Sequence, residues 1–406
     1  MRVLFTTWSA PSHLYPLIPM AWACRAAGHE VRFAGMPSAV PGMLQAGLTA
    51  TAVGSDAELT GMSSSGKLAA WHKQEPWPDD WPERPDKLVP EQVELLAALG
   101  RKQCVIAERM VDDLVAVVER WRPDLIVSDV STFAGPVAGA VAGIPVVGQL
   151  WGSPGVLRYE NRALGEEPLP EYAALFARFG LDAPVAPAAL LDPCPPSMNL
   201  GSVLPRLPMR FVPYNSPGEA PAWADEPAGR PRVCVTWGVT AAKVLGAAVL
   251  EPLHHIVSAV AGLGAEPVVA VAAAQRALLP ALPEGTRIVE SMPLHLLMPH
   301  CDAIVHQGGA GTALTAAAHG VPQLVVPQRP APMLIGDRLA AVGAGRTLPH
   351  QVVAGDEHAG KLVAAELDAL LTDPAHREAA VRLAGENAAQ PAPAELVAAL
   401  AELVAR

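Results

Sequence analysis

The stretch His306-Gln307-Gly308-Gly309-Ala310-Gly311-Thr312 joins a short apolar run, residues 303–305, to an alanine-rich segment, residues 313–319. This order predicts a strand, a glycine turn and the start of a helix. The first N–H groups of a helix have no intrahelical partner and lie at the positive end of its dipole, so a phosphate is a natural ligand there. The glycines allow close approach of the backbone, and the side chains of His306 and Thr312 add hydrogen-bond donors. A tight turn without a ligand has the same pattern, so the rest of the chain must decide.

Length and composition exclude several classes of protein. A chain of 406 residues with 51% hydrophobic and 17% charged residues predicts a soluble, globular protein with two domains. No apolar run reaches the roughly 18–20 residues of a membrane span, and no signal peptide follows the first strand. The five cysteines are scattered, which favours a cytoplasmic location and argues against a structural zinc site. A net charge of −11 disfavours nucleic-acid binding.

Short apolar runs alternate with helix-period segments along both halves, which predicts two Rossmann-like parallel α/β sheets facing each other across a cleft. The expected strands are Arg2–Thr7, Glu30–Gly35, Leu125–Ser128, Val146–Gln149, Val233–Thr236, Pro267–Val271, Arg287–Val289, Ala303–His306 and Gln323–Val326.

The pattern breaks in a Pro/Gly/Ala-rich segment that we interpret as the linker between two domains. The predicted boundaries are 1–212 for the N-terminal domain, 213–230 for the linker and 231–387 for the C-terminal domain. A helix at about 388–406 is expected to pack back on the N-terminal domain. Residues 63–90 carry three tryptophans among prolines and charges, which predicts a long loop or a loosely held helix.

Two polar residues follow strands of the first sheet. His13 lies at the corner between the first strand and a helix whose first turn contains Pro16 and Pro19. Asp129 ends the strand at Leu125–Ser128, on the same rim. A neutral imidazole held by a carboxylate is a suitable general base, although a helix-capping role for either residue fits the pattern as well.

Together these residues resemble the family 1 glycosyltransferases of the two-domain GT-B fold, and in particular the actinobacterial branch that attaches deoxysugars to polyketides and related natural products. Three segments carry the resemblance: residues 12–31, residues 209–215 leading to 232–238, and residues 293–295 with 306–312 and 320–323. In this order they are specific, and the resemblance covers essentially the whole chain.

The resemblance implies an inverting, metal-independent transfer of a (deoxy)sugar from a thymidine diphosphate sugar to a hydroxyl of a lipophilic aglycone, with no cofactor. His13 corresponds to the base, and Asp129 to the carboxylate that orients it. The residues expected to bind the donor are Gly238, Thr240, Met292, His306, Gly308, Gly309, Ala310, Gly311, Thr312, Gln328 and Arg329. Those expected to line the acceptor site are Trp8, Trp77, Phe133 and Trp151. The resemblance also leaves open a homodimer and a helper protein that docks near Trp71–Trp81.

The chain departs from the family pattern at two places. Ser291-Met292 replace the aromatic residue that commonly stacks on the nucleobase, although the methionine sulfur can still contact a ring. Ala331-Pro332 replace an acidic pair that commonly binds the hydroxyls of the donor sugar. Either the sugar is highly deoxygenated, or Gln328 or Arg329 substitutes, or donor use is impaired.

Three other functions share part of this sequence pattern. A dinucleotide-binding dehydrogenase is disfavoured because the first turn, residues 9–13, contains no glycine. A nucleotide-sugar epimerase or hydrolase of the same fold stays open, as does a ligand-binding or partner-dependent homologue that no longer transfers sugar.

Overall fold

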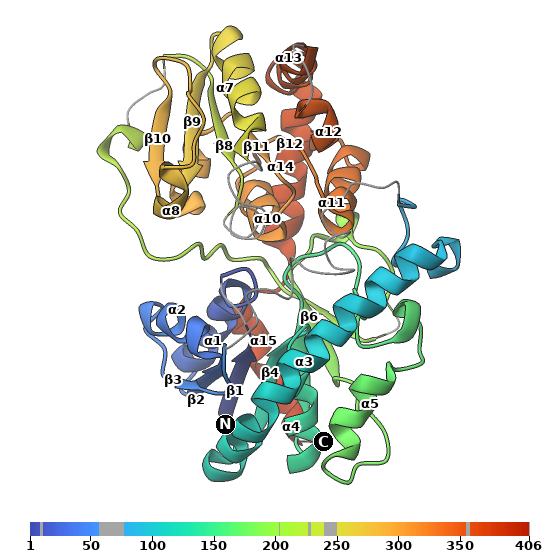
Figure 1. The fold of residues 1–406 in the computed structure, drawn as a ribbon. Helices are drawn as coiled ribbons and strands as arrows, with labels where there is room; N and C mark the ends of the chain where they lie inside the picture. Colours follow the sequence, from blue (N-terminus) through green and yellow to red (C-terminus); the bar gives the residue numbers. More distant parts are fainter. Residues whose placement is uncertain are drawn as a thin grey trace.

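The computed structural model contains two parallel α/β domains, one above the other in Figure 1. It describes residues 1–8, 11–56, 77–202, 204–225, 229–238, 250–354 and 358–405.

The N-terminal sheet has seven described strands in the order β3-β2-β1-β4-β5-β6-β7, all parallel. Its central strands are continuous apolar runs because helices cover both faces. The strands are β1 (Arg2–Thr7), β2 (Glu30–Gly35), β3 (Ala50–Ala52), β4 (Leu125–Asp129), β5 (Val146–Gln149), β6 (Ala189–Asp192) and β7 (Arg206–Pro208). The helices are α1 (Ile18–Ala26), α2 (Val40–Gln45), α3 (Pro90–Trp121), α4 (Ala134–Ala142) and α5 (Pro170–Ala177).

The second sheet has six described strands in the order β10-β9-β8-β11-β12-β13, again all parallel. Its strands are β8 (Arg232–Thr236), β9 (Glu266–Val271), β10 (Arg287–Glu290), β11 (Ala303–His306), β12 (Gln323–Val325) and β13 (Gly345–Thr347). The helices that follow the linker are α7 (Pro252–Gly262), α8 (Ala273–Arg276), α9 (Leu294–Leu297), α10 (Ala310–Ala318), α11 (Pro330–Ala341), α12 (His350–Val353), α13 (His358–Thr372), α14 (Pro374–Ala389) and α15 (Pro393–Ala405).

Every strand expected from the sequence is present, with its ends shifted by at most one residue. The strands that sequence reasoning missed are β3, β6, β7 and β13. Three of them are sheet edges of three residues each, with sequences ATA, RLP and GRT, so they carry no apolar run to reveal them. The last, β6, is a four-residue run that ends in a charge.

The chain returns to the N-terminal domain at its end. α14 ends at Ala389, and α15 begins at Pro393, five residues after the expected start of the C-terminal helix at about 388. Leu396, Val397 and Leu400 of α15 join the core cluster formed by α1 and β1. Figure 1 shows α15 among the helices of that domain.

The side-chain amide of Asn387, near the end of α14, binds the backbone of Phe211, which lies just before the linker. Asn387 accepts a hydrogen bond from the Phe211 N–H at 2.8 Å and donates one to the Phe211 carbonyl at 3.1 Å. Both hydrogen bonds are buried, so they hold together the two segments of the chain that pass between the domains.

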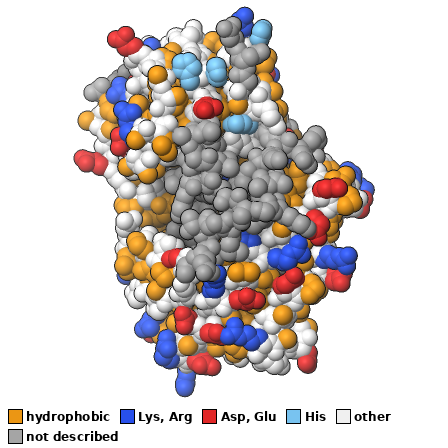
Figure 2. Space-filling model, viewed as in Figure 1, with side chains coloured by type: hydrophobic (Ala, Val, Ile, Leu, Met, Phe, Trp, Pro, Cys, Tyr) orange, Lys and Arg blue, Asp and Glu red, His pale blue; other side chains and the backbone are white. Residues whose placement is uncertain are grey.

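The described surface carries charges of both signs. On the described part of the face in Figure 2, acidic and basic side chains are interspersed. No helix in the part of the chain that the structure describes is long and apolar enough to cross a membrane.

Candidate active site

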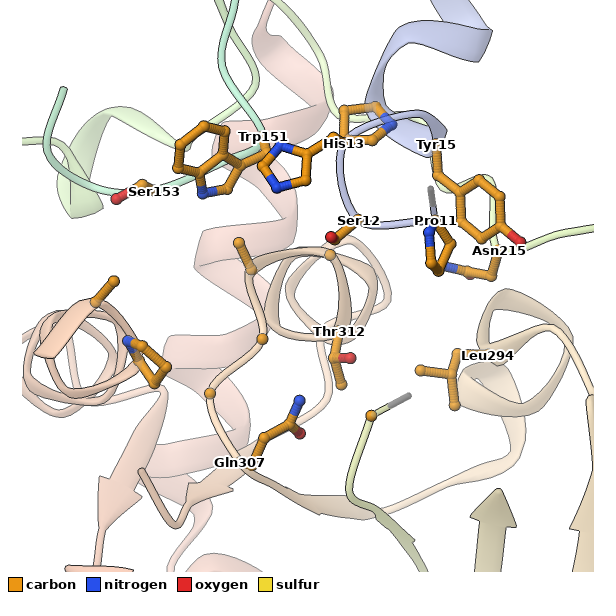
Figure 3. Close-up of a pocket in the computed structure, with 18 of the residues that line it drawn as sticks. Pro11, Ser12, His13, Tyr15, Trp151, Ser153, Asn215, Leu294, Gln307 and Thr312 are labelled. Atoms are coloured by element: carbon orange, nitrogen blue, oxygen red, sulfur yellow. The ribbon is translucent and has the colours of Figure 1, made fainter. Parts of the chain in front are cut away.

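A cavity of about 820 Å³ is lined by residues of both sheets. The corner after β1 supplies Ser12 and His13, and the corner after β11 supplies the glycine turn that begins at Gln307. Figure 3 shows His13 and Trp151 on one side of this cavity, with Gln307 and Thr312 on the other. The carboxyl ends of two parallel sheets therefore face each other, as is usual for ligand sites in such folds.

His13 and Asp129 are in contact. The Nδ1 atom of His13 lies 3.1 Å from Oδ1 of Asp129, which is buried with 2% of its side chain exposed. An ionised carboxylate only accepts hydrogen bonds, so Nδ1 carries the proton and Nε2 is left with a lone pair. Because His13 lines the cavity, this lone pair is available to a substrate hydroxyl.

Two hydroxyls fix the other oxygen of Asp129. Ser131 Oγ donates to Oδ2 at 2.7 Å, and Thr132 Oγ1 donates to it at 2.8 Å. Ser131 Oγ in turn accepts from the indole N–H of Trp8 at 2.9 Å, and it lies 3.1 Å from His13 Nδ1. The network orients both the carboxylate and the imidazole, as a base needs before its substrate arrives.

Aromatic rings hold the imidazole from two sides. The His13 ring lies 5.3 Å from the Trp8 ring and 5.2 Å from the Trp151 ring, centroid to centroid. Both tryptophans line the cavity, where the sequence analysis places them.

The opposite wall is a backbone surface. Gly309 is the N-cap of α10, and the next three residues, Ala310 to Thr312, supply N–H groups that a helix leaves without intrahelical partners. Gly308 has a φ of +85°, and a Cβ there would lie 2.7 Å from Cβ of Pro332. Only glycine allows this turn and this approach of α11.

Gly238, after β8, packs against the same turn. Its φ is +64°, and an added Cβ would lie 2.3 Å from Nε2 of Gln307. Its carbonyl accepts a hydrogen bond from the side chain of Gln275 at 2.8 Å. Gly238 lines the cavity as expected, whereas the predicted donor residue Thr240 lies outside the described residues.

His306 differs from the expectation. Its ring is fully buried and does not line the cavity. Nδ1 accepts from the Gly308 N–H at 3.0 Å, and Nε2 lies 2.9 Å from Oε1 of Gln323, so both nitrogens are occupied inside the protein. Burial lowers its pKa to about 4, so the ring is neutral. The prediction that its side chain donates to a ligand is therefore wrong: His306 supports the turn.

The far end of the cavity has a second unusual backbone position. Ser291, just after β10, has a φ of +52° and uses its hydroxyl to accept from the Ala273 N–H at 3.2 Å. Met292 lines the cavity, as do Leu294 and Gln275.

Three more predictions need correction. Phe133 is buried and packs against Tyr172 at 5.0 Å between ring centroids, so it belongs to the core. Trp77 packs against Trp81 at 5.1 Å and does not line the described cavity. Gln328 is buried and does not line it either. The residue types fit a binding site, but packing buries Phe133 and Gln328 and holds the half-buried Trp77 against Trp81.

The tryptophan-rich segment is described only in part. Trp71 lies outside the described residues. Trp81 is almost fully buried, so it offers no docking surface for another protein. A helper protein stays a prediction.

Ala331 and Pro332 line the cavity, and so does Arg329 at the start of α11. Ala331 packs against the cluster that contains Trp81 and Leu157 of the N-terminal domain. Several other lining residues lie inside helices or loops that carry no sequence motif; they include Lys102, Gln103 and Tyr159. Gln307 also lines the cavity, and it lies within the predicted glycine turn.

The described residues contain no group of three or more His, Cys, Asp or Glu side chains arranged to hold a metal ion.

Comparison with known proteins decides the family. The model of the erythromycin biosynthesis protein CIII-like N-terminal domain matches residues 22–238, and that of the corresponding C-terminal domain matches residues 254–403. The chain is 36% identical to TDP-daunosamine transferase DnrS of Streptomyces peucetius over 100% of this chain and 97% of that protein. It is 35% identical to 10-deoxymethynolide desosaminyltransferase of Streptomyces venezuelae, over 100% and 98%. The chain belongs to this family of GT-B glycosyltransferases.

Solved structures of the family share the fold over the full length. The spinosyn rhamnosyltransferase SpnG complexed with thymidine diphosphate superposes with a TM-score of 0.82 at 30% identity, over 99% of this chain and 100% of that one. SpnG has also been solved complexed with the spinosyn aglycone. As a glycosyltransferase of the natural-product branch, the chain places its glycine turn and its His13 corner in a single cavity between the sheets.

Proposed function

We propose that this glycosyltransferase moves a deoxysugar from a thymidine diphosphate sugar to a hydroxyl group of a lipophilic aglycone, with inversion at the anomeric carbon and without a metal ion. One observation carries the proposal. A histidine–aspartate pair faces the N-terminus of α10 across one cavity, with His13 and Thr312 both lining it.

His13 acts as the general base. An acceptor hydroxyl donates to Nε2, its oxygen forms a bond to the anomeric carbon, and its proton passes to the imidazole. The bond between that carbon and the diphosphate oxygen breaks, and the nucleoside diphosphate leaves with the electron pair. The imidazolium that forms is stabilised by Asp129, 3.1 Å away. Attack from the face opposite the leaving group inverts the centre.

The glycine turn stabilises the leaving group. The backbone N–H groups of Ala310 to Thr312 and the hydroxyl of Thr312 are oriented before the reaction by α10 and by the Gly308 turn. Fixed dipoles aimed at developing negative charge stabilise a transition state without reorganisation. This supports a reaction in which no metal ion neutralises the diphosphate.

The choice of thymidine rests on relatives. DnrS is named for a TDP-sugar, and SpnG binds thymidine diphosphate. In this chain Met292, Leu294 and Gln275 line the end of the cavity expected to hold the base. The acceptor end is lined by Trp8, Trp151, Leu99 and Leu157, which suits an apolar polycycle or macrocycle.

Calorimetric titration tests the donor assignment. Thymidine diphosphate should bind in the presence of EDTA, uridine diphosphate more weakly, and NAD not at all. Absence of nucleotide binding, or binding only with Mg²⁺, would overturn the donor site as proposed. Formation of thymidine diphosphate and a glycoside from a thymidine diphosphate deoxysugar and an aglycone then tests transfer itself.

A further inference from the structure

The described lining of the cavity contains two side chains of the strongly basic types, lysine and arginine. Lys102 comes from α3 of the N-terminal domain, and Arg329 comes from the N-cap position of α11. No aspartate or glutamate is among the described lining residues, since Asp129 lies behind His13. The described lining therefore holds basic but no acidic side chains, although the protein as a whole carries a charge of −11.

The guanidinium of Arg329 has no anion to balance it in the part of the chain that the structure describes. It makes no hydrogen bond or ion pair with a described residue. Burial lowers the pKa of Arg329, and the hydroxyl of Tyr159 is the neighbour that acts against this. Placing a guanidinium in such surroundings costs free energy that a bound anion would offset.

Lys102 lies in the same electrostatic environment. Its Nζ atom is 5.4 Å from the centroid of the Trp8 ring, and the His13 ring lies 5.3 Å from a Trp8 ring centroid. Burial lowers the pKa of Lys102, and the positive charge of Arg329 lowers it further. The two basic groups are therefore near each other, and the guanidinium of Arg329 is the one that a bound anion would stabilise.

The position of the pair indicates which ligand brings the anion. Lys102 lies beside Trp8, next to the catalytic base, and Arg329 lies beside Tyr159, which packs with Trp151 against the Leu157 cluster of the N-terminal domain. Trp8, Trp151 and Leu157 line the end of the cavity assigned above to the acceptor, whereas the diphosphate is assigned to backbone amides of α10. Arg329, which the family resemblance places with the donor, lies close to the acceptor end in the structure.

We propose that Lys102 and Arg329 form an anion subsite for an acidic group of the acceptor, a carboxylate or an acidic phenol, held while a separate hydroxyl of the same molecule faces His13. The assignment of this wall to the acceptor rests on the proposed function. It predicts selection for acidic over neutral or cationic acceptors.

Fluorescence titration with a matched pair of probes tests the subsite. The probes are 6-hydroxy-2-naphthoate and its methyl ester, added to the full chain saturated with thymidine diphosphate. The acid should bind about tenfold more tightly than the ester, as expected for one charge-assisted hydrogen bond. Equal binding, or no binding of either probe, would overturn the subsite.

Variants locate the effect. Arg329→Met should abolish the preference for the acid and leave the affinity for thymidine diphosphate within about twofold, while Arg329→Lys should retain part of the preference. Arg382→Met is the matched control, because Arg382 lies on the exposed face of α14 and does not line the cavity. If Arg329→Met instead weakens thymidine diphosphate binding about tenfold and keeps the preference for the acid, the guanidinium binds the donor and the proposal is wrong.

The same titrations separate this proposal from the proposed function. Without nucleotide, a preference for the acid that disappears in Arg329→Met supports the subsite even if no thymidine diphosphate binds. Tight nucleotide binding without any preference for the acid supports the donor site and overturns the subsite alone.

Discussion

The corner after β1 and the corner after β11 both contain a histidine, yet the two histidines are used in opposite ways. His13 presents one nitrogen to the cavity and gives the other to a buried carboxylate. His306 uses both nitrogens inside the protein to hold a glycine turn. The corner after β1 acts through the side chain of His13, whereas the corner after β11 acts through its backbone. Substitutions at the first corner should therefore lower the rate of transfer, and substitutions at the second should lower the affinity for the diphosphate.

The largest effect is expected from a substitution at the His13 corner. In His13→Ala, transfer should fall about 10³-fold because the acceptor hydroxyl loses its general base. The affinity for thymidine diphosphate should stay within a few fold, since the glycine turn proposed to bind the diphosphate lies in the C-terminal domain. Steady-state rates and calorimetry measure the two quantities; transfer near the original rate would show that His13 is not the base.

Asp129→Asn tests how much of the transfer rate depends on the orientation of the His13 imidazole. An amide can donate to Nδ1 and so favour the tautomer with its lone pair facing the wrong way. We expect about a 10²-fold loss in kcat with an unchanged dissociation constant for thymidine diphosphate. Thermal unfolding of the variant is the control for a loss of stability, because the hydroxyls of Ser131 and Thr132 also donate hydrogen bonds to this carboxylate.

Thr312→Ala weakens the other corner. Removal of one hydroxyl that bonds a charged phosphate should reduce the affinity for thymidine diphosphate by about 1–2 kcal/mol. Thr312→Ser keeps the hydroxyl and serves as the control. An unchanged affinity in the alanine variant would place the phosphates away from α10.

His306 gives the smallest expected effect, and it concerns stability. Its pKa is about 4 in the folded protein, below the ordinary value of 6.5, so the folded state favours the neutral ring. The stabilisation is complete above pH 6.5 and decreases as the pH falls toward 4, by about 1 kcal/mol or more near pH 5. Urea unfolding at several pH values measures it. His306→Asn retains an acceptor for the Gly308 N–H but does not titrate, so its stability should depend less on pH; an equal dependence would assign the effect to other groups.

Much of the fold could be predicted because long parallel strands are apolar runs bounded by turns. β1, β4, β8 and β11 were visible for that reason, and the short edge strands β3, β7 and β13 were not. The pairing of His13 with Asp129 was also predictable, because both follow neighbouring strands, β1 and β4, at one edge of the sheet.

The sequence by itself determined two α/β domains, the glycine turn before α10 and the histidine at the first corner, since strand periodicity and glycine positions are local properties of the chain. Only the tertiary structure decided which side chains face the cavity. Phe133 and His306 have suitable chemistry but are buried by packing, whereas Lys102 lies within the long helix α3 and reaches the cavity because that helix passes beside Trp8. The direction of a side chain depends on contacts between segments far apart in the chain, and no local pattern records those contacts.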